Sequence, residues 1–173
     1  VYRGPNSVLY GSDAAAGVVA LNTPRGSTAF PSLLYEGDAG NFKGYRNQVQ
    51  LGGMKGKLDY YGGFSNLQMQ NSTPNSSYHN YTEAANLGWS WSAKTQVRVT
   101  GRNTNSATGV PSGNSGYSFY GLANDGKELD QDTYMSATID HTIRDTWKAT
   151  VRYGLGRKRE ESQQWYPAGN LLA

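Results

Sequence analysis

Cysteine is absent from the 173 residues of this chain, which excludes a disulfide scaffold and thiolate metal sites within it. Hydrophobic residues make up only 36% of the sequence, too few for a soluble domain built on a large aliphatic core. No run of about 18 apolar residues occurs, and the longest apolar stretch, Ala14–Leu21, is too short to span a bilayer as a helix. Any membrane contact would therefore be made by strands.

Charge of one sign is also scarce. The formal net charge is +3, and the sequence has no concentrated basic face of the kind that binds nucleic acid. Low hydropathy alone would suit a disordered chain, but 13 tyrosines and 4 tryptophans recur along the sequence, whereas disorder depletes aromatic residues. The chain begins at Val1 in the middle of a pattern, and we expect the natural N-terminus to lie upstream.

Apolar and polar residues alternate from about Ser32 onward, which is the pattern of half-buried strands. Over 45–51, for example, tyrosine, valine and leucine fall on one face, and arginine and glutamine fall on the other. One face is thus apolar and aromatic, and the opposite face is polar and often charged. The alternation predicts roughly seven strands, at 32–39, 45–54, 57–67, 81–92, 95–106, 132–143 and 147–160.

The predicted connections alternate between short and long. Tight turns are expected at 54–57, 93–95 and 144–146, and longer connections rich in Gly, Asn and Ser at 38–44, 70–80 and 107–131. An up-and-down barrel of an outer membrane has this arrangement, with short turns on the periplasmic side and long loops outside. Aromatic residues near the strand ends suit its interfacial girdles: Trp89, Trp91 and Trp147 beside short turns, and Tyr45, Tyr78 and Tyr81 beside long ones.

We therefore predict an all-β chain that forms about seven strands of a transmembrane up-and-down antiparallel β-barrel. The alternative is a soluble β-sandwich, because its strands also have one buried and one wetted face. Sandwiches seldom keep short and long connections in register with strand direction. Their apolar faces also use Val, Ile and Leu more than Tyr, Trp, Gly and Ala.

The first 26 residues have a different character. Pro5 after Gly4 suits the first position of a short helix over 6–10, which Gly11 would end. A run of small residues follows, and Val18–Leu21 reads as a buried strand before the break at 22–26. This is the chemistry of a compact globular segment.

The stretch VYRGPNSVLYGSDAAAGVVALNTPRG resembles the C-terminal end of the plug domain of TonB-dependent outer-membrane receptors. Its Tyr-Gly-Ser-Asp-Ala form is most similar to the cobalamin-transporter branch, although Ala16 stands where many members carry a second glycine. The resemblance implies a plug end at 1–26, a linker at 27–31 and the N-terminal part of a barrel of about 22 strands at 32–173. The residues that carry it are Arg3, Gly4, Pro5, Leu9, Tyr10, Gly11 and Gly17.

Members of this family take up a large, scarce nutrient, such as siderophore-iron, cobalamin or an oligosaccharide, across the Gram-negative outer membrane. The resemblance implies partners of three kinds: the TonB complex through an N-terminal segment absent from this chain, outer-membrane lipid with lipopolysaccharide, and an extracellular small ligand. Arg3 with the Gly4-Pro5 turn would hold the plug against the wall. A passive porin and a soluble carbohydrate-binding β-sandwich are the alternatives, and the plug-like segment disfavours the porin.

The connection 107–131 carries the candidate ligand-binding residues. Aromatic side chains in its first half suit stacking on a ligand ring or sugar, and oxygen donors in its second half suit Ca²⁺. The spacing does not match an EF-hand, so a solvated acidic loop is the favoured interpretation over a structural calcium site. The ligand-contact candidates are Tyr117, Phe119, Tyr120, Asn124 and Asp125, and the calcium candidates are Asp125, Asp130 and Asp132, beside Glu128.

No pattern in the sequence predicts an enzyme. His79 and His141 lack a serine, aspartate or second histidine at the spacing of a triad or a zinc site. The basic run at 157–159 could contact lipopolysaccharide phosphates. Alternation, however, turns Lys158 the same way as Arg152, which favours a charged lumen wall.

Overall fold

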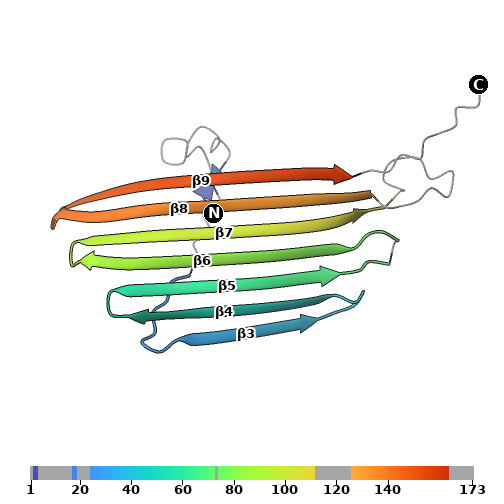
Figure 1. Ribbon diagram of the computed structural model, residues 1–173, viewed down its shortest axis with the longest axis horizontal. Coiled ribbons are helices and arrows are strands. Elements are labelled where there is room, and N and C mark those ends of the chain that lie inside the picture. Colours follow the sequence, from blue (N-terminus) through green and yellow to red (C-terminus); the bar gives the residue numbers. More distant parts are fainter. Residues whose placement is uncertain (1, 4–16, 19–23, 73, 112–125, 164–173) are drawn as a thin grey trace, which may run out of the picture.

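The computed structural model describes residues 2–3, 17–18, 24–72, 74–111 and 126–163. Most of these residues form one antiparallel sheet in which each strand lies beside its neighbour in sequence (Figure 1). A separate antiparallel pair joins β1 (Tyr2–Arg3) to β2 (Gly17–Val18). The sheet contains β3 (Ser32–Ala39), β4 (Tyr45–Lys55), β5 (Leu58–Met69), β6 (Tyr78–Ser92), β7 (Thr95–Val110), β8 (Gly126–Arg144) and β9 (Trp147–Gln163).

The all-β fold and the seven-stranded antiparallel meander confirm the predicted pattern. The sheet is not closed into a barrel, and the described residues show no plug domain. The predicted helix at 6–10 lies outside the described residues, and of the predicted strand Val18–Leu21 only Val18 is described, in β2. No helix long and apolar enough to cross a bilayer occurs in the described part of the chain.

The strands extend further than the alternation predicts at the end of the sheet that carries the long connections. Strand β6 begins at Tyr78, β7 continues to Val110, and β8 begins at Gly126, so much of the expected 107–131 loop is strand. These extensions contain polar residues and glycines, such as Asn80, Gly109 and Asp130, which are common in loops. Pairing with the neighbouring strand nevertheless gives their backbone groups hydrogen-bond partners, as in Gly109 against Lys127.

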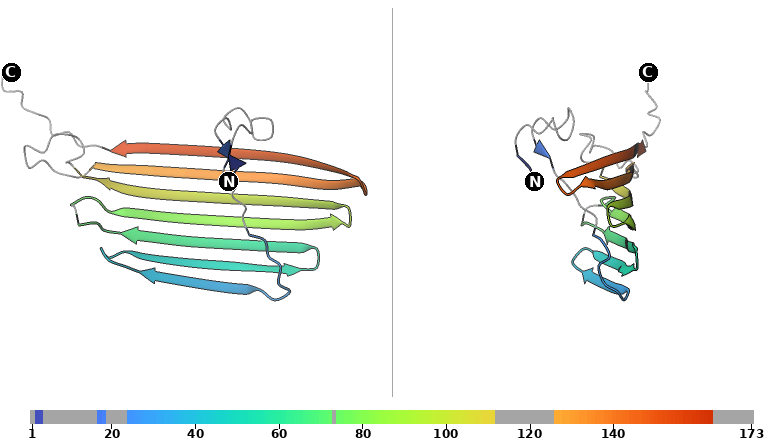
Figure 2. Two further views of the ribbon diagram at one scale, coloured as in Figure 1. Left: turned by 180° about the vertical axis from the view of Figure 1, so that it is seen from behind. Right: turned by 90° about the vertical axis from the view of Figure 1, so that its left-hand side faces the viewer.

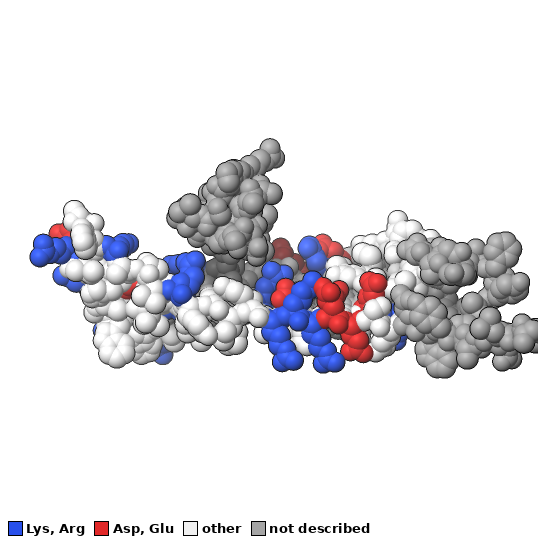
Figure 3. Space-filling model, turned by 90° about the horizontal axis from the view of Figure 1, so that it is seen from above, with Lys and Arg blue, Asp and Glu red and all other residues white. Residues whose placement is uncertain are grey.

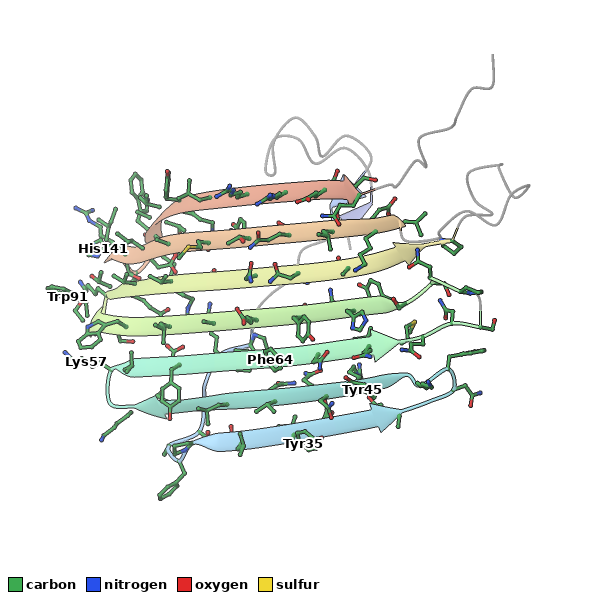
Figure 4. All side chains as sticks on the ribbon, turned by 45° about the vertical axis from the view of Figure 1, so that its right-hand side comes forward. Tyr35, Tyr45, Lys57, Phe64, Trp91 and His141 are labelled. Carbon is green, nitrogen blue, oxygen red and sulfur yellow. The ribbon has the colours of Figure 1, made fainter. Side chains whose placement is uncertain are left out.

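Short connections lie at one end of the sheet and long ones at the other, as the sequence predicts (Figure 1). Only two residues separate β4 from β5. The chain can reverse direction in so short a turn because Gly56 adopts a positive φ of 60°. Figure 4 shows Lys57, Trp91 and His141 together at the short-turn end. There the Lys57 ammonium donates a hydrogen bond to the Trp91 carbonyl at 3.3 Å.

The strand register separates the side chains into two faces, because directly paired residues in antiparallel strands point the same way. One face, here called the apolar face, contains rows such as Leu33, Leu51, Gly62, Ala85, Gly101, Met135 and Leu155. The other, here called the polar face, contains rows such as Gln48, Ser65, Thr82, Thr104, Asp132 and Lys158. Among the aromatic residues expected at the girdles, Tyr78 is an exception, since it pairs with Met69 on the polar face.

In the middle of the sheet, on β6, the exposure of the two faces is the reverse of that in a soluble sheet. Along β6, Leu87 is 51% exposed and Trp89 is 50% exposed, whereas Asn86, which precedes Leu87 and points to the other face, is 2% exposed. The sheet is a single layer, seen edge-on in the right-hand view of Figure 2. No second sheet or helix among the described residues covers the apolar face.

The segment 24–31, here called the connector, crosses the polar face before the chain enters β3 (Figure 2). The Asn86 side chain on β6 donates a hydrogen bond to the Pro24 carbonyl at 2.9 Å. Further along, the Met54 amide on β4 donates one to the Thr28 carbonyl at 2.7 Å. Between these points Gly26 is buried, and a Cβ added to it would lie 2.1 Å from the Gly53 carbonyl oxygen.

Gly26→Ala should therefore lift the connector from the sheet. The new methyl group would collide with backbone, which cannot rotate away, and we expect a loss of about 1–3 kcal/mol of unfolding free energy. The measurement is the guanidinium unfolding midpoint. Gly62→Ala is the matched control, because nothing lies within 4 Å of a Cβ built there. Equal midpoints for the two variants would contradict this packing.

Candidate functional site

A buried charged cluster lies on the polar face beneath the connector. Arg98 on β7 makes two hydrogen bonds of 2.8 Å to the two carboxylate oxygens of Asp59 on β5. The same guanidinium donates to the Asn86 side-chain oxygen on β6 at 2.5 Å. All three residues are at most 9% exposed, so a bidentate ion pair and an amide are held together away from water.

Gly88 makes room for this ion pair. It lies between Asp59 and Arg98 in the register, on the same face. A Cβ at Gly88 would lie 2.2 Å from the Asp59 carboxylate and 2.3 Å from the Arg98 guanidinium. Only glycine at this position lets the two charged side chains meet across the intervening strand.

Asn86 links the ion pair to the connector. Its oxygen accepts a hydrogen bond from Arg98, and its amide nitrogen donates one to the Pro24 carbonyl. A buried ion pair is weak evidence for stability, because desolvation offsets its attraction, but it fixes position well. The cluster therefore determines where the N-terminal part of the chain enters the polar face. Sequence alternation placed these residues on one face but gave no sign that they pair.

The plug-like motif is described only in part. Backbone pairing brings Arg3 in β1 opposite Gly17 in β2. The remaining motif residues, Gly4, Pro5, Leu9, Tyr10 and Gly11, lie outside the described residues. The proposed role of Arg3 and the Gly4-Pro5 turn against the wall stays a prediction.

Two of the three candidate calcium ligands lie in a strand and not in a loop. Asp130 and Asp132 lie within β8, where they pair with Glu160 and Lys158 on β9, and Asp125 lies outside the described residues. Lys158 forms an ion pair with Glu160 on the same face. No group of three metal-binding side chains occurs in the part of the chain that the structure describes. The placement of Asp130 in a loop was therefore wrong, because strand pairing extends through this polar sequence.

The aromatic ligand candidates Tyr117, Phe119 and Tyr120, together with Asn124, lie outside the described residues. The structure instead shows what holds the two ends of that connection. Asn75, at a positive φ of 53°, donates from its side chain to the carbonyls of Val110 and Gly126, both at 2.9 Å. Asparagine tolerates this backbone conformation better than other non-glycine residues. The turn-rich sequence around Asn75 predicted a loop but not its partners.

The apolar face carries a band of exposed hydrophobic side chains that runs obliquely across the strands. In one register row, Val49 and Phe64 on β4 and β5 are apolar, but the same row ends in Thr133 and Arg157 on β8 and β9. On β9 the band instead continues toward the short turns, as far as Trp147, which is 67% exposed. The band thus shifts along the strands as it crosses the sheet.

The basic run at 157–159 is divided between the two faces. Lys158 lies on the polar face with Arg152, as alternation predicted. Arg157 and Arg159 lie on the apolar face, beyond Leu155. From above, over the β9 edge, cationic and anionic side chains gather side by side (Figure 3). Next to Arg159 is a shallow groove of about 360 Å³, lined also by Tyr81, Asn105 and Gln131.

The histidines do not form a catalytic arrangement among the described residues. His141 lies 2.9 Å from the Thr95 hydroxyl on the neighbouring strand, an exposed cross-strand contact. His79 lies in β6 rather than in a loop, and it lines the groove beside Arg159. The two residues are at opposite ends of the sheet, since β6 begins at the long-connection end and β8 finishes at the short-turn end.

Asp59→Asn should destabilise the protein by about 3–5 kcal/mol, because the buried Arg98 guanidinium would lose its counter-charge. The exposed pair of Asp38 and Arg46 offers a matched control, and Asp38→Asn should cost about 1 kcal/mol or less. Guanidinium unfolding midpoints measure both effects. Equal losses for the two variants would contradict a positioning role for the buried cluster.

Comparison with known proteins adds no assignment. No protein-family model, no curated protein and no solved structure matches the chain. The features of the chain that bear on its function are therefore the two faces of the sheet, the connector and the sequence motif.

Proposed function

We propose that this chain forms part of the wall of a TonB-dependent outer-membrane receptor. Its sheet would be one section of a transmembrane β-barrel, with the apolar face toward lipid and the polar face toward the lumen. The protein would take up a large, scarce nutrient across the outer membrane of a Gram-negative cell. It would act as a transporter and not as an enzyme.

The observation that carries the proposal is the exposed apolar face. Large side chains such as Leu155, Val151 and Tyr153 are 58%, 67% and 64% exposed on a single strand. Apolar patches beyond a few hundred Å² are rare on soluble monomers and mark membrane or protein contacts. A band that crosses seven strands, opposite a face of charged and hydroxyl side chains, fits a barrel wall between lipid and an aqueous lumen.

The oblique course of the band favours a barrel over a sandwich. Barrel strands tilt by about 35–45° to the membrane normal, so a bilayer of constant thickness covers different residues on successive strands. The shift from Val49 on β4 to Trp147 on β9 has this form. Unpaired edge strands cannot face lipid, so the proposal requires further strands beside β3 and β9.

The connector supports a plugged receptor over an open porin. Pro24 and Gly26 approach the sheet on its polar face, so the preceding chain enters from the side that would be the lumen. A plug domain inside a barrel must connect to the wall from the lumen side in this way. The resemblance of 1–26 to the plug end supports the same assignment. In such a receptor, the ligand would bind at the outer loops, and the TonB complex would pull on an N-terminal segment to rearrange the plug.

Ala137→Arg and Ser136→Arg in the full-length gene product test the orientation of the sheet. The two residues are adjacent on β8, are both small, and lie on the apolar and polar faces respectively. Arginine facing lipid costs about 2–4 kcal/mol near the midplane, so Ala137→Arg should reduce the yield of folded barrel, whereas Ser136→Arg should not.

Gel migration of boiled and unboiled outer-membrane fractions provides the measurement. The natural sequence and Ser136→Arg should show a heat-modifiable band, and Ala137→Arg should show less of it. A soluble protein without a heat-dependent shift would overturn the proposal and favour the β-sandwich.

A further inference from the structure

We propose that Arg157 and Arg159 form a binding site for the phosphate groups of outer-leaflet lipid, which is lipopolysaccharide in a Gram-negative outer membrane. This inference rests on the proposed function, because it requires the apolar face to contact lipid. Of the basic run 157–159, it assigns the two arginines to the outer surface of the wall and Lys158 to the lumen.

The height of the two arginines matches a headgroup layer. They follow Leu155 by two and four residues on the same face of β9, which is about 7 Å and about 14 Å along the strand. With a strand tilt near 45°, these distances become about 5 Å and about 10 Å along the membrane normal. Both side chains therefore lie just beyond the apolar band, at the end that carries the long connections.

The charge around these side chains is unbalanced on this face. The register neighbours of Arg157 on β8 and β7 are Thr133 and Asn103, and those of Arg159 are Gln131 and Asn105. All four neighbours are neutral. Arg159 contacts Glu161 at 3.3 Å, but both side chains are well exposed, so water weakens that pair. No ion pair involves Arg157 among the described residues.

Lys158 differs from its two neighbours. It points to the polar face, where it pairs with Glu160 and lies opposite Asp132. Its charge is therefore matched by carboxylates on its own face. Within the run 157–159, the side chain that carboxylates on its own face surround is therefore Lys158, on the polar face.

The groove beside Arg159 provides further hydrogen-bonding groups at the same level. Asn105 and Gln131 line it, together with the acidic residues Asp130 and Glu161. Tyr81 lines it too, and its ring centroid lies 6.4 Å from that of Phe64 in the apolar band. Guanidinium groups make charge-assisted hydrogen bonds to phosphate, and amides bind the sugar hydroxyls of a glycolipid. An amphiphile with phosphorylated sugars and acyl chains would thus fit both the groove and the band below it.

The test uses the full-length protein in detergent and purified lipid A, with and without its phosphates, as probes. Binding is measured by native mass spectrometry for the natural sequence, for the double variant Arg157→Gln/Arg159→Gln, and for the control Lys158→Gln. We expect phosphorylated lipid A to bind the natural protein and the control equally. The double variant should bind at least about tenfold more weakly, and removal of the phosphates should have a similar effect on the natural protein.

Equal binding of phosphorylated lipid A to the double variant and the natural protein would overturn the inference. Equal binding of the two lipids to the natural protein would also overturn it. If the double variant does not fold, the single variants Arg157→Gln and Arg159→Gln carry the same comparison, and unchanged affinity in both would overturn it. Heat-modifiable migration of the natural protein is checked in the same preparation, so its absence would identify a failure of the proposed barrel itself.

Discussion

A sheet one layer thick has no interior of its own, and this constraint governs the whole structure. Its strands satisfy each other's backbone groups, but the apolar face must be covered by something else. The described residues supply no cover for side chains such as Leu87 and Trp89, each about half exposed. They do cover part of the opposite face, where Asn86 is buried under the connector. Packing within the described residues is thus on the polar face, and we propose that lipid covers the apolar face.

The polar face contains a buried hydrogen-bonded network, which a wall that only faces water would not need. The bidentate pair of Arg98 and Asp59, the space left by Gly88 and the bond from Asn86 to Pro24 form one continuous path from sheet to connector. This path fixes the point at which the preceding chain meets the sheet. In a plugged receptor, that point would remain in place while the rest of the plug rearranges.

The sequence predicted much of the fold, because strand periodicity is local and strong. The seven strands, their order and the alternation of short and long connections all follow from it. It did not predict the full strand lengths near Asp130, since polar strand extensions are determined by pairing with neighbours and not by their own composition. The buried pair of Arg98 and Asp59 was also missed, because strand β6 lies between its members and only the register brings them together.

In the proposed wall, alternate residues of each strand face lipid and an aqueous lumen. Since the chain has no cysteine, single cysteines introduced along 134–139 of β8 in the full-length protein can carry a spin label in a reconstituted bilayer. We expect labels at Met135, Ala137 and Ile139 to be accessible to oxygen, which concentrates in lipid. The same labels should be inaccessible to a water-soluble nickel complex. Labels at Ser136 and Thr138 should not show this oxygen preference. Equal access of the nickel complex to both sets, or shielding of the odd-numbered set from both reagents, would contradict a lipid-facing wall.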